Sequence, residues 1–494
     1  MKKALTLFLG VVFVLLCFAG CKNNNDNKTP NVTREPTNTE SVLPDKDWGG
    51  RELKVTELDS ELESVIDSGE DTSTPISYEV YARNAEIEAK YNFTISTTRI
   101  AADDRPSEKV RTEALAGEST YDIVIDSPGY MHGALLNFIF ADLNQLQYID
   151  WNAKGWDQKS NDELDICGYR FICTGDLNLQ EKAGSSVIYC NRDMLESLTE
   201  EDVRQTVIDG EWTIEKMNEL MRLAKRIDGA TGNTEIYGLV NGGNGVFVNF
   251  MTSSFGMKFS LKDDQGIPHI SFDETAYFQS VDHWIDEVLK FYANGELTWT
   301  QRYSGTKHPV YQLKAIEMFK NGKALFYGGE LDDIVDFQRN ATFAYTTLPY
   351  PIYDTETQTE YIAARNYSWS GLLAIPYYAK DGDFSAFALQ ALNERSGKLM
   401  HLYVEEKCKI RGSVDEMDYQ LMTLALSNSS YDIGVVYDWG ALKTWIFKDR
   451  YDDASGYQSI PVSGTNTFAS LWAMDKDLAH TEVNNCLRTL GIIE

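Results

Sequence analysis

The sequence predicts an α/β protein in which helices cover two mixed sheets, arranged as two lobes. Strand-like and helix-like segments alternate along most of the chain, which is the pattern of a helix-covered sheet. The alternation occurs in two separate blocks. The chain has 494 residues, 43% of them apolar, and this is long enough for two domains or one large two-lobed domain.

The first block predicts a parallel sheet. Apolar runs predict strands at residues 53–56, 93–96 and 121–126, and helical spacing of apolar residues predicts helices at 77–91 and 107–116. Sheets of this kind bind ligands beyond the carboxyl ends of their strands. We therefore expect the loop that follows the third strand to lie at a binding edge.

The second block repeats the alternation. Its predicted strands lie at residues 186–189, 237–240, 324–327 and 372–375, and its predicted helices at 214–224, 277–292 and 311–319. Thr213 is a good N-cap for the first of these helices. A glycine-rich loop follows the strand at 237–240, and the chain from residue 384 onward is mainly helical.

The first 21 residues predict export and lipid anchoring. A positively charged start and an apolar run at 4–18, too short to span a bilayer, are typical of a signal peptide at 1–20. Ala19-Gly20 stands directly before Cys21 and resembles the lipobox of bacterial lipoproteins, whose cysteine carries the lipid. The alternative is an ordinary signal peptide with a chance cysteine. The resemblance implies an extracytoplasmic protein anchored at the outer face of the plasma membrane.

Composition limits the partners. Residues 22–47 are rich in Asn, Thr and Pro and have no apolar periodicity. We therefore predict a disordered linker, which together with Cys21 forms the segment 21–47. The formal net charge of −30 disfavours nucleic acid and anionic surfaces as partners. No later apolar stretch approaches 18 residues, so we expect membrane contact through the N-terminal lipid only.

The cysteines and histidines do not suggest a metal or cofactor site. Beyond Cys21 the chain has an odd number of cysteines without CxxC spacing, namely Cys167, Cys173, Cys190, Cys408 and Cys486. Buried free thiols are expected, and a pairing of Cys167 with Cys173 stays open. Six scattered histidines have no metal-ligand spacing. We expect no metal and no cofactor.

Seven motifs, in order, resemble those of the extracellular solute-binding proteins of bacterial ABC importers, specifically the maltose-binding-protein-like group. They are a helix at 78–91 followed by NFTI at 92–95, YDIVID at 121–126, ADL at 141–143, VIYCNRDML at 187–195, EWT at 211–213, MFKNGKA at 318–324 and TLPYP at 347–351. The resemblance extends over most of residues 48–494.

The resemblance implies the type II periplasmic-binding-protein fold, with two lobes joined by crossing hinge segments and a ligand held between them. By the motifs, lobe one would contain residues 48–173 and 325–377, and lobe two residues 174–324 and 378–494. It also implies a monomer that delivers its ligand to ABC permease subunits.

Candidate ligand-binding residues follow from the chemistry of a sugar, which offers apolar faces ringed by hydroxyls and so favours aromatic planes and planar polar groups. Loops at strand ends and the segments that the resemblance implies contain such residues. These are Asp126, Ser127, Tyr130, Asn244, Phe247, Tyr327, Glu330, Trp369 and Trp439. The structural alternatives are a turn for Asp126 and Glu330, core packing for Phe247, and core or surface packing for Trp369 and Trp439.

We therefore expect a carbohydrate-binding protein, with an oligosaccharide as ligand and hinge closure as mechanism, and not an enzyme. One alternative is an exported glycosidase, which needs two suitably spaced carboxylates. The sequence contains no GxSxG, HExxH or P-loop motif. The other alternative is a binding protein that acts as an adhesin or sensor, which would share the fold and differ only in its partner.

Overall fold

In the computed structural model, the described helices and strands lie within residues 36–494. The described residues are 41–59, 64–70, 72–101, 103–241, 244–293, 309–334, 341–368, 370–409, 415–441, 451–452, 457–458, 460 and 465–494. The predicted signal peptide, Cys21 and most of the predicted linker lie outside them. None of the described helices is long and apolar enough to cross a membrane.

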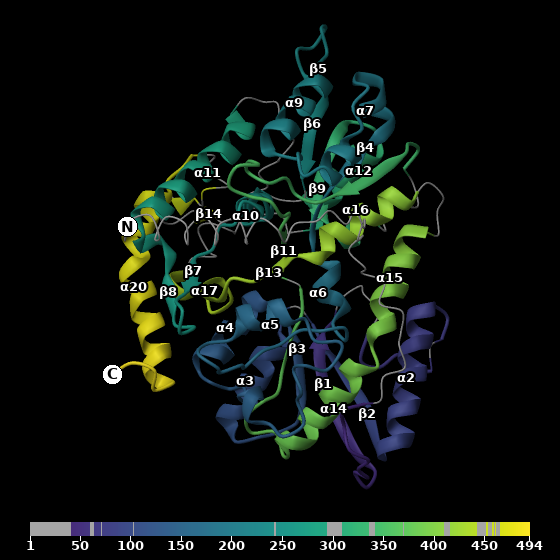
Figure 1. Ribbon diagram of the computed structural model, residues 1–494, viewed down its shortest axis with the longest axis vertical. Coiled ribbons are helices and arrows are strands. Elements are labelled where there is room, and N and C mark those ends of the chain that lie inside the picture. The colour runs from purple at the N-terminus through teal and green to yellow at the C-terminus, as the bar shows by residue number, and fades with distance from the viewer. Residues whose placement is uncertain are drawn as a thin grey trace, which may run out of the picture. The chain divides into compact units, whose positions relative to one another are not determined.

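A four-stranded sheet forms the core of one lobe, in the order β12-β3-β1-β2 (Figure 1). Its strands are β1 (Arg51–Leu58), β2 (Phe93–Ile100), β3 (Ile123–Asp126) and β12 (Leu372–Ala374). β1 pairs in parallel with both β2 and β3, while β12 runs antiparallel to β3. The parallel sheet predicted from the first block is confirmed, and its carboxyl edge ends at Asp126.

Helices cover both faces of this sheet, since successive side chains of each strand point to opposite faces. Ile123 and Ile125 pack with α2 (Pro75–Tyr91) and α14 (Gly382–Glu394), whereas Val124 packs with α3 (Pro106–Ala116) and α4 (Pro128–Leu136). Local sequence sets the start of α2: Pro75 occupies its first turn, and the Thr74 hydroxyl accepts a hydrogen bond from the Ser77 amide at 3.0 Å.

The first described residues pack into the same lobe. Leu43 is buried in the cluster formed by α2, α14 and the sheet. The Trp48 ring contacts the rings of Phe384 and Phe387 with centroids 5.0 and 5.3 Å away, and its amide donates to the Tyr91 carbonyl at 2.9 Å. The chain therefore enters the fold beside the amino end of β1.

A five-stranded sheet forms the core of the second lobe, in the order β10-β4-β9-β6-β5. Its strands are β4 (Ser186–Asn191), β5 (Arg226–Ile227), β6 (Thr234–Asn241), β9 (Ala324–Glu330) and β10 (Tyr345–Leu348). One face packs on α7 (Arg192–Leu198), α8 (Val203–Ile208), α9 (Ile214–Ala224) and α10 (Asn244–Ser254). The other packs on α12 (Pro309–Lys320), α15 (Gly397–Lys409) and α16 (Glu416–Ser427).

Two segments lie in different lobes from those predicted. Residues 325–377 were expected in lobe one, but β9 and β10 belong to the five-stranded sheet. Residues from 378 onward were expected in lobe two, but α14 packs on the four-stranded sheet. The physical reason is that β9 pairs with β4, a strand far away in sequence, and local periodicity contains no information about such a partner.

The remaining elements connect the lobes or flank them. They are α5 (Gln158–Leu164), α6 (Leu179–Ala183), β7 (Ser260–Lys262), β8 (Pro268–Ile270), α11 (Thr275–Ala293), β11 (Ala363–Ala364), β13 (Ser429–Ser430), α17 (Ile433–Val436), β14 (Tyr451–Asp452), β15 (Tyr457–Gln458), α20 (Phe468–Thr489), and the 3₁₀ turns η1 (Leu143–Gln145), η2 (Ser271–Asp273), η3 (Leu331–Asp333) and η4 (Trp439–Ala441). α11, α17 and α20 share one hydrophobic cluster with α4. β11 and β13 pair in parallel.

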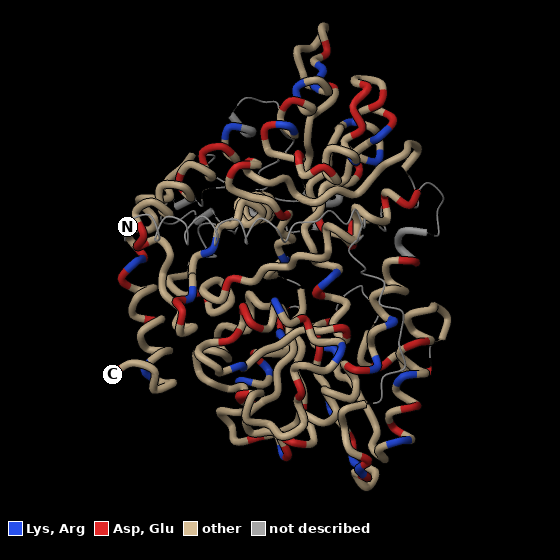
Figure 2. Tube along the Cα trace, in the orientation of Figure 1, with Lys and Arg blue, Asp and Glu red and all other residues tan. Residues whose placement is uncertain are grey.

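Two sequence expectations concern charge and thiols. Asp and Glu are spread over helices of both lobes and interspersed with Lys and Arg, so the negative charge is a general surface property (Figure 2).

Four cysteines are free, namely Cys167, Cys173, Cys190 and Cys486, so Cys167 and Cys173 are not paired. The Cys408 side chain lies outside the described residues.

Replacing Phe387 by Ala tests the aromatic packing of the first lobe. Phe387 is fully buried and contacts the rings of Trp48, Tyr91 and Tyr148. Removing it should lower the free energy of unfolding by about 3–5 kcal/mol, measured by urea unfolding. As a control, Tyr78→Ala on the exposed side of α2 should change it by less than about 0.5 kcal/mol. Equal effects would contradict the assignment of α14 to this core.

Candidate functional site

The two lobes meet around the segment that leads from β11 to β12. Arg365 forms a bridge with Ser185, and the Asn366 amide donates to the Gly184 carbonyl at 3.0 Å. The Tyr367 carbonyl accepts from the Gly129 amide at 2.7 Å, which ties the same segment to the β3–α4 loop. We call residues 126–130, 157–160, 178–185, 363–371 and 428–432 the lobe junction.

A buried ion pair lies at the centre of the lobe junction. The Arg365 Nε bonds to Glu181 Oε1, and both side chains are completely buried. Burial alone would raise the pKa of the Glu181 carboxyl, but the positive charges of Arg365 and Lys182 outweigh it and lower that pKa. Glu181 therefore stays ionised inside the protein.

Lys182 extends this pair into a network. Its Nζ lies 2.9 Å from Glu181 Oε2 and 3.0 Å from Asp157 Oδ2. Burial of Asp157 favours the neutral acid, yet the ammonium of Lys182 and the hydrogen bonds from Ser160 hold the pKa of Asp157 well below its usual range. Asp157 also accepts from the Ser429 hydroxyl at 3.2 Å, which connects α5 to β13.

The loop after β3 places three predicted site residues beside the junction. Asp126 is buried, and its carboxylate accepts from the Ser107 amide at 3.0 Å, the Ser107 hydroxyl at 2.5 Å and the Ser127 amide at 2.7 Å. Burial raises the pKa of Asp126 despite these bonds. Ser127 is buried as well, whereas Tyr130 is partly exposed.

Arg105 was not among the predicted residues, yet it lies over Tyr130. Its guanidinium carbon is 3.4 Å from the centroid of the Tyr130 ring, and its Nη1 is 3.6 Å from Asp126 Oδ1. The rule used for β3 points to this region, because Arg105 comes five residues after β2, a parallel strand of the same sheet whose carboxyl end lies at the same edge.

Glu330 reaches the junction from the other sheet. It ends β9, and its Oε1 accepts a hydrogen bond from the Asn366 side chain. Tyr327, three residues earlier, is completely buried, where its hydroxyl donates to Asp333 at 2.8 Å and its ring stacks on Tyr189. The loop that contains Asp126, Ser127 and Tyr130 is thus bonded to the β11–β12 segment through Gly129. Glu330 is bonded to the same segment through Asn366.

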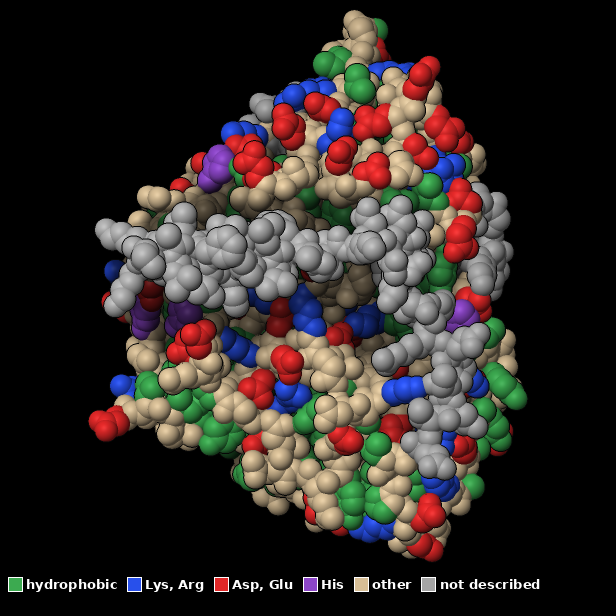
Figure 3. Space-filling view, in the orientation of Figure 1, with side chains coloured by type: hydrophobic (Ala, Val, Ile, Leu, Met, Phe, Trp, Pro, Cys, Tyr) green, Lys and Arg blue, Asp and Glu red, His purple; other side chains and the backbone are tan. Residues whose placement is uncertain are grey.

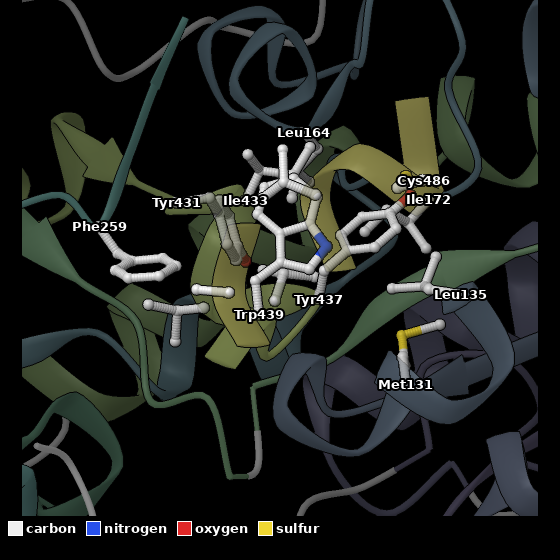
Figure 4. Close-up of a cluster of buried hydrophobic side chains, with 14 of the residues drawn as sticks. Met131, Leu135, Leu164, Ile172, Phe259, Tyr431, Ile433, Tyr437, Trp439 and Cys486 are labelled. Atoms are coloured by element: carbon white, nitrogen blue, oxygen red, sulfur yellow. The ribbon is translucent and has the colours of Figure 1, made fainter. Parts of the chain in front are cut away.

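The other predicted aromatic residues lie elsewhere. Phe247 is buried on α10, with its ring centroid 6.0 Å from that of Tyr350. Trp439 is completely buried in the hydrophobic cluster that α4 and α17 share, with its ring centroid 5.3 Å from that of Tyr437 (Figure 4). Trp369 and the side chain of Asn244 lie outside the described residues. Their roles in ligand binding stay predictions.

The lobe junction is polar rather than aromatic on its described surface. Figure 3 shows the molecule hollowed at this level, and Lys and Arg side chains are visible in the hollow. Among the described residues, His, Cys, Asp and Glu do not gather in any group that could hold a metal ion. Because the Glu181–Arg365 pair is completely buried, hydrogen bonds to a solute would come from partly exposed polar groups around it.

Comparison with protein families decides the identity of the fold. The model of bacterial extracellular solute-binding proteins matches residues 71–393, well over half of the chain. The chain belongs to this family. The matched range contains the four predicted residues beside the junction and both members of the buried ion pair. A search of curated protein sequences finds no match.

Solved structures support the type II fold of this solute-binding protein. UspC of M. tuberculosis superposes with a TM-score of 0.55 and 13% identity, covering 87% of this chain and all of that one. The GacH receptor of Streptomyces glaucescens, solved with acarbose, gives 0.54 and 12%, covering 87% and 99%. The Listeria monocytogenes maltose-binding protein in complex with maltose gives 0.54 and 12%, covering 88% and 98%.

Removing one partner of the Glu181–Arg365 pair should lower the free energy of unfolding more than replacing both partners with apolar residues. Glu181→Gln or Arg365→Met alone leaves a buried charge without its partner and should lower the free energy of unfolding by about 3–5 kcal/mol. Glu181→Leu combined with Arg365→Met should recover most of that loss. Urea unfolding of the four proteins measures this, with Arg111→Met of the exposed Glu108–Arg111 pair as a control expected below about 1 kcal/mol.

A second prediction concerns pH. Asp432 caps α17 and accepts hydrogen bonds from the Gly434 amide at 3.0 Å and from Phe259, and burial raises its pKa to about 6. The folded protein thus binds this proton more tightly than the unfolded chain. The resulting stability is present below about pH 4 and is lost as the pH rises through 6, a fall of roughly 3 kcal/mol.

Asp432→Asn isolates this contribution from those of other carboxylates. The unfolding free energy of the wild type minus that of the variant should decrease between pH 4 and pH 6.5. A difference that is constant over this range would contradict the raised pKa of Asp432.

Proposed function

We propose that this protein binds a carbohydrate, with an oligosaccharide as its ligand, outside the cytoplasm and delivers it to the permease of an ABC importer. The observation that carries the proposal is the family match together with a polar lobe junction to which both sheets contribute. Fold neighbours solved with maltose or acarbose support the ligand class. Tyr130, Ser127 and Glu330 are the described candidates for contact, and Trp369 and Asn244 complete the set.

Hinge closure is the mechanism that fits the connections between lobes. The segment from β11 to β12 is bonded to Gly184 and Ser185 before β4, and to Glu330 at the end of β9. A ligand that contacts both lobes has a higher affinity for the closed state and shifts the equilibrium toward it. No covalent step is needed for this cycle.

The carboxylates of the junction suit binding better than hydrolysis. A glycosidase needs one protonated acid and one free carboxylate on either side of a glycosidic bond. Glu181 and Asp157 are held ionised by Arg365 and Lys182, and Asp126 is occupied by amide and hydroxyl donors. Buried carboxylates of this kind position the polar groups around them, and contact with sugar hydroxyls falls to partly exposed residues such as Tyr130.

The N-terminal segment completes the proposal. A lipid on Cys21 and the linker that follows it hold the monomer at the outer face of the plasma membrane. This linker is shorter than the predicted 22–47, because Leu43 already packs on the first lobe. Tethering keeps the loaded protein close to its permease, and Cys21→Ala should bind ligand normally but fail in uptake.

A ligand panel tests the function. Titration of the purified protein with oligosaccharides, peptides and polyamines, followed by tryptophan fluorescence and calorimetry, should give saturable binding to sugars only. Small-angle scattering should detect compaction at saturation. Trp369→Ala should weaken binding about tenfold, as expected for the loss of one stacking contact. Trp151→Ala, on the four-stranded lobe, serves as the control. Saturable binding of a peptide and of no sugar would refute the carbohydrate assignment.

A further inference from the structure

Arg105 has a backbone conformation that needs an explanation. It stands directly before α3 with φ 53° and ψ 128°, a region that residues other than glycine rarely occupy. Its side chain forms no cap for the helix. Strain of this kind costs on the order of 1–3 kcal/mol and persists where the surroundings or a function require it.

The strained backbone directs the guanidinium onto Tyr130. The stacking distance of 3.4 Å means that one face of the phenol ring is covered by a cation and not available to a sugar ring. A ligand that approaches this face of Tyr130 therefore meets a guanidinium plane first. Phe247, Tyr327 and Trp439, the other described aromatic candidates, are buried.

Arg105 is also short of partners. Its side chain is 12% exposed, its Nη1 lies 3.5 Å from the Ser127 hydroxyl, and its Nε is buried without a hydrogen-bond partner in the described part of the chain. Its ion pair with Asp126 Oδ1 is long, at 3.6 Å, and that carboxylate also accepts three shorter bonds from Ser107 and Ser127. A desolvated cation with unmet donors favours a state in which an acceptor reaches it.

We infer that the ligand is an acidic carbohydrate, whose uronate carboxylate is bound by the guanidinium of Arg105 on its Tyr130 platform. This rests on the proposed carbohydrate-binding function and specifies its substrate class. A carboxylate matches the planar fork of an arginine with two parallel hydrogen bonds, and charge-assisted bonds are about twice as strong as neutral ones. A sugar hydroxyl would meet only one donor and would bring no negative charge to supplement the long ion pair with Asp126.

The test compares acidic oligosaccharides with neutral partners that differ only by reduction of each carboxylate to CH₂OH. Three pairs are used at equal length: trigalacturonate with α-1,4-galactotriose, β-1,4-triglucuronate with cellotriose, and trimannuronate with β-1,4-mannotriose. Calorimetry with the purified protein should show that the best acidic member binds at least about tenfold more tightly than its neutral partner.

Variants of Arg105 link this preference to the residue. Arg105→Gln should weaken binding of the acidic member by about 10- to 100-fold and that of its neutral partner by less than about threefold. Arg105→Lys keeps the charge but loses the planar fork of donors. Its affinity for the acidic member should lie between those of the wild type and Arg105→Gln. Arg111→Gln, on the exposed side of the same helix, removes the same charge and should leave both affinities unchanged. Thermal unfolding followed by circular dichroism verifies that each variant is folded.

The outcomes separate the inference from the function. Equal or tighter binding of a neutral member, or an equal loss for both members in Arg105→Gln, would refute the acidic ligand and leave the carbohydrate function intact. Binding of a peptide with no binding of any sugar in either set would refute the proposed function itself.

Discussion

The buried ion pair between Glu181 and Arg365 is the interaction on which the arrangement of the two lobes depends. Each partner is costly to remove from water, so each constrains the segment that contains it. Glu181 belongs to α6, just before the five-stranded sheet begins, and Arg365 to the segment that returns the chain to the four-stranded sheet. The pair therefore holds together two of the chain segments that connect the lobes.

Most elements of the fold could be predicted from the sequence, but their partners could not. Apolar runs and helical spacing located β1, β2, β3, α2 and α3, because these signals depend on neighbouring residues. The sheet to which β9 belongs depends on pairing with β4, well over a hundred residues away. The apolar face of α14 fits either sheet equally well by periodicity, so the sequence did not indicate the lobe that it covers.

Residues of the candidate site could be predicted where they stand at or just after the carboxyl end of a strand. The carboxyl-edge rule found Asp126, Ser127 and Tyr130, and Glu330 ends a strand of the other sheet. Aromatic content was a weaker guide, because a buried Trp439 and a ligand-stacking tryptophan have the same sequence signature. Arg105 escaped notice since it follows β2 by five residues, and its importance comes from a strained backbone that no pattern of residue types specifies.

The packing of Leu43 and Trp48 has a practical consequence for handling the protein. Both residues attach the start of the fold beside Arg51, at the amino end of β1, whereas Asp126 follows Ile125, which pairs with Glu57 near the other end of that strand. Six residues of extended chain separate the two ends by about 20 Å. Attachment to a surface through Ser41 would thus leave about this distance between the anchor and the carboxyl edge, so the lobe junction stays open to solutes when the protein is immobilised.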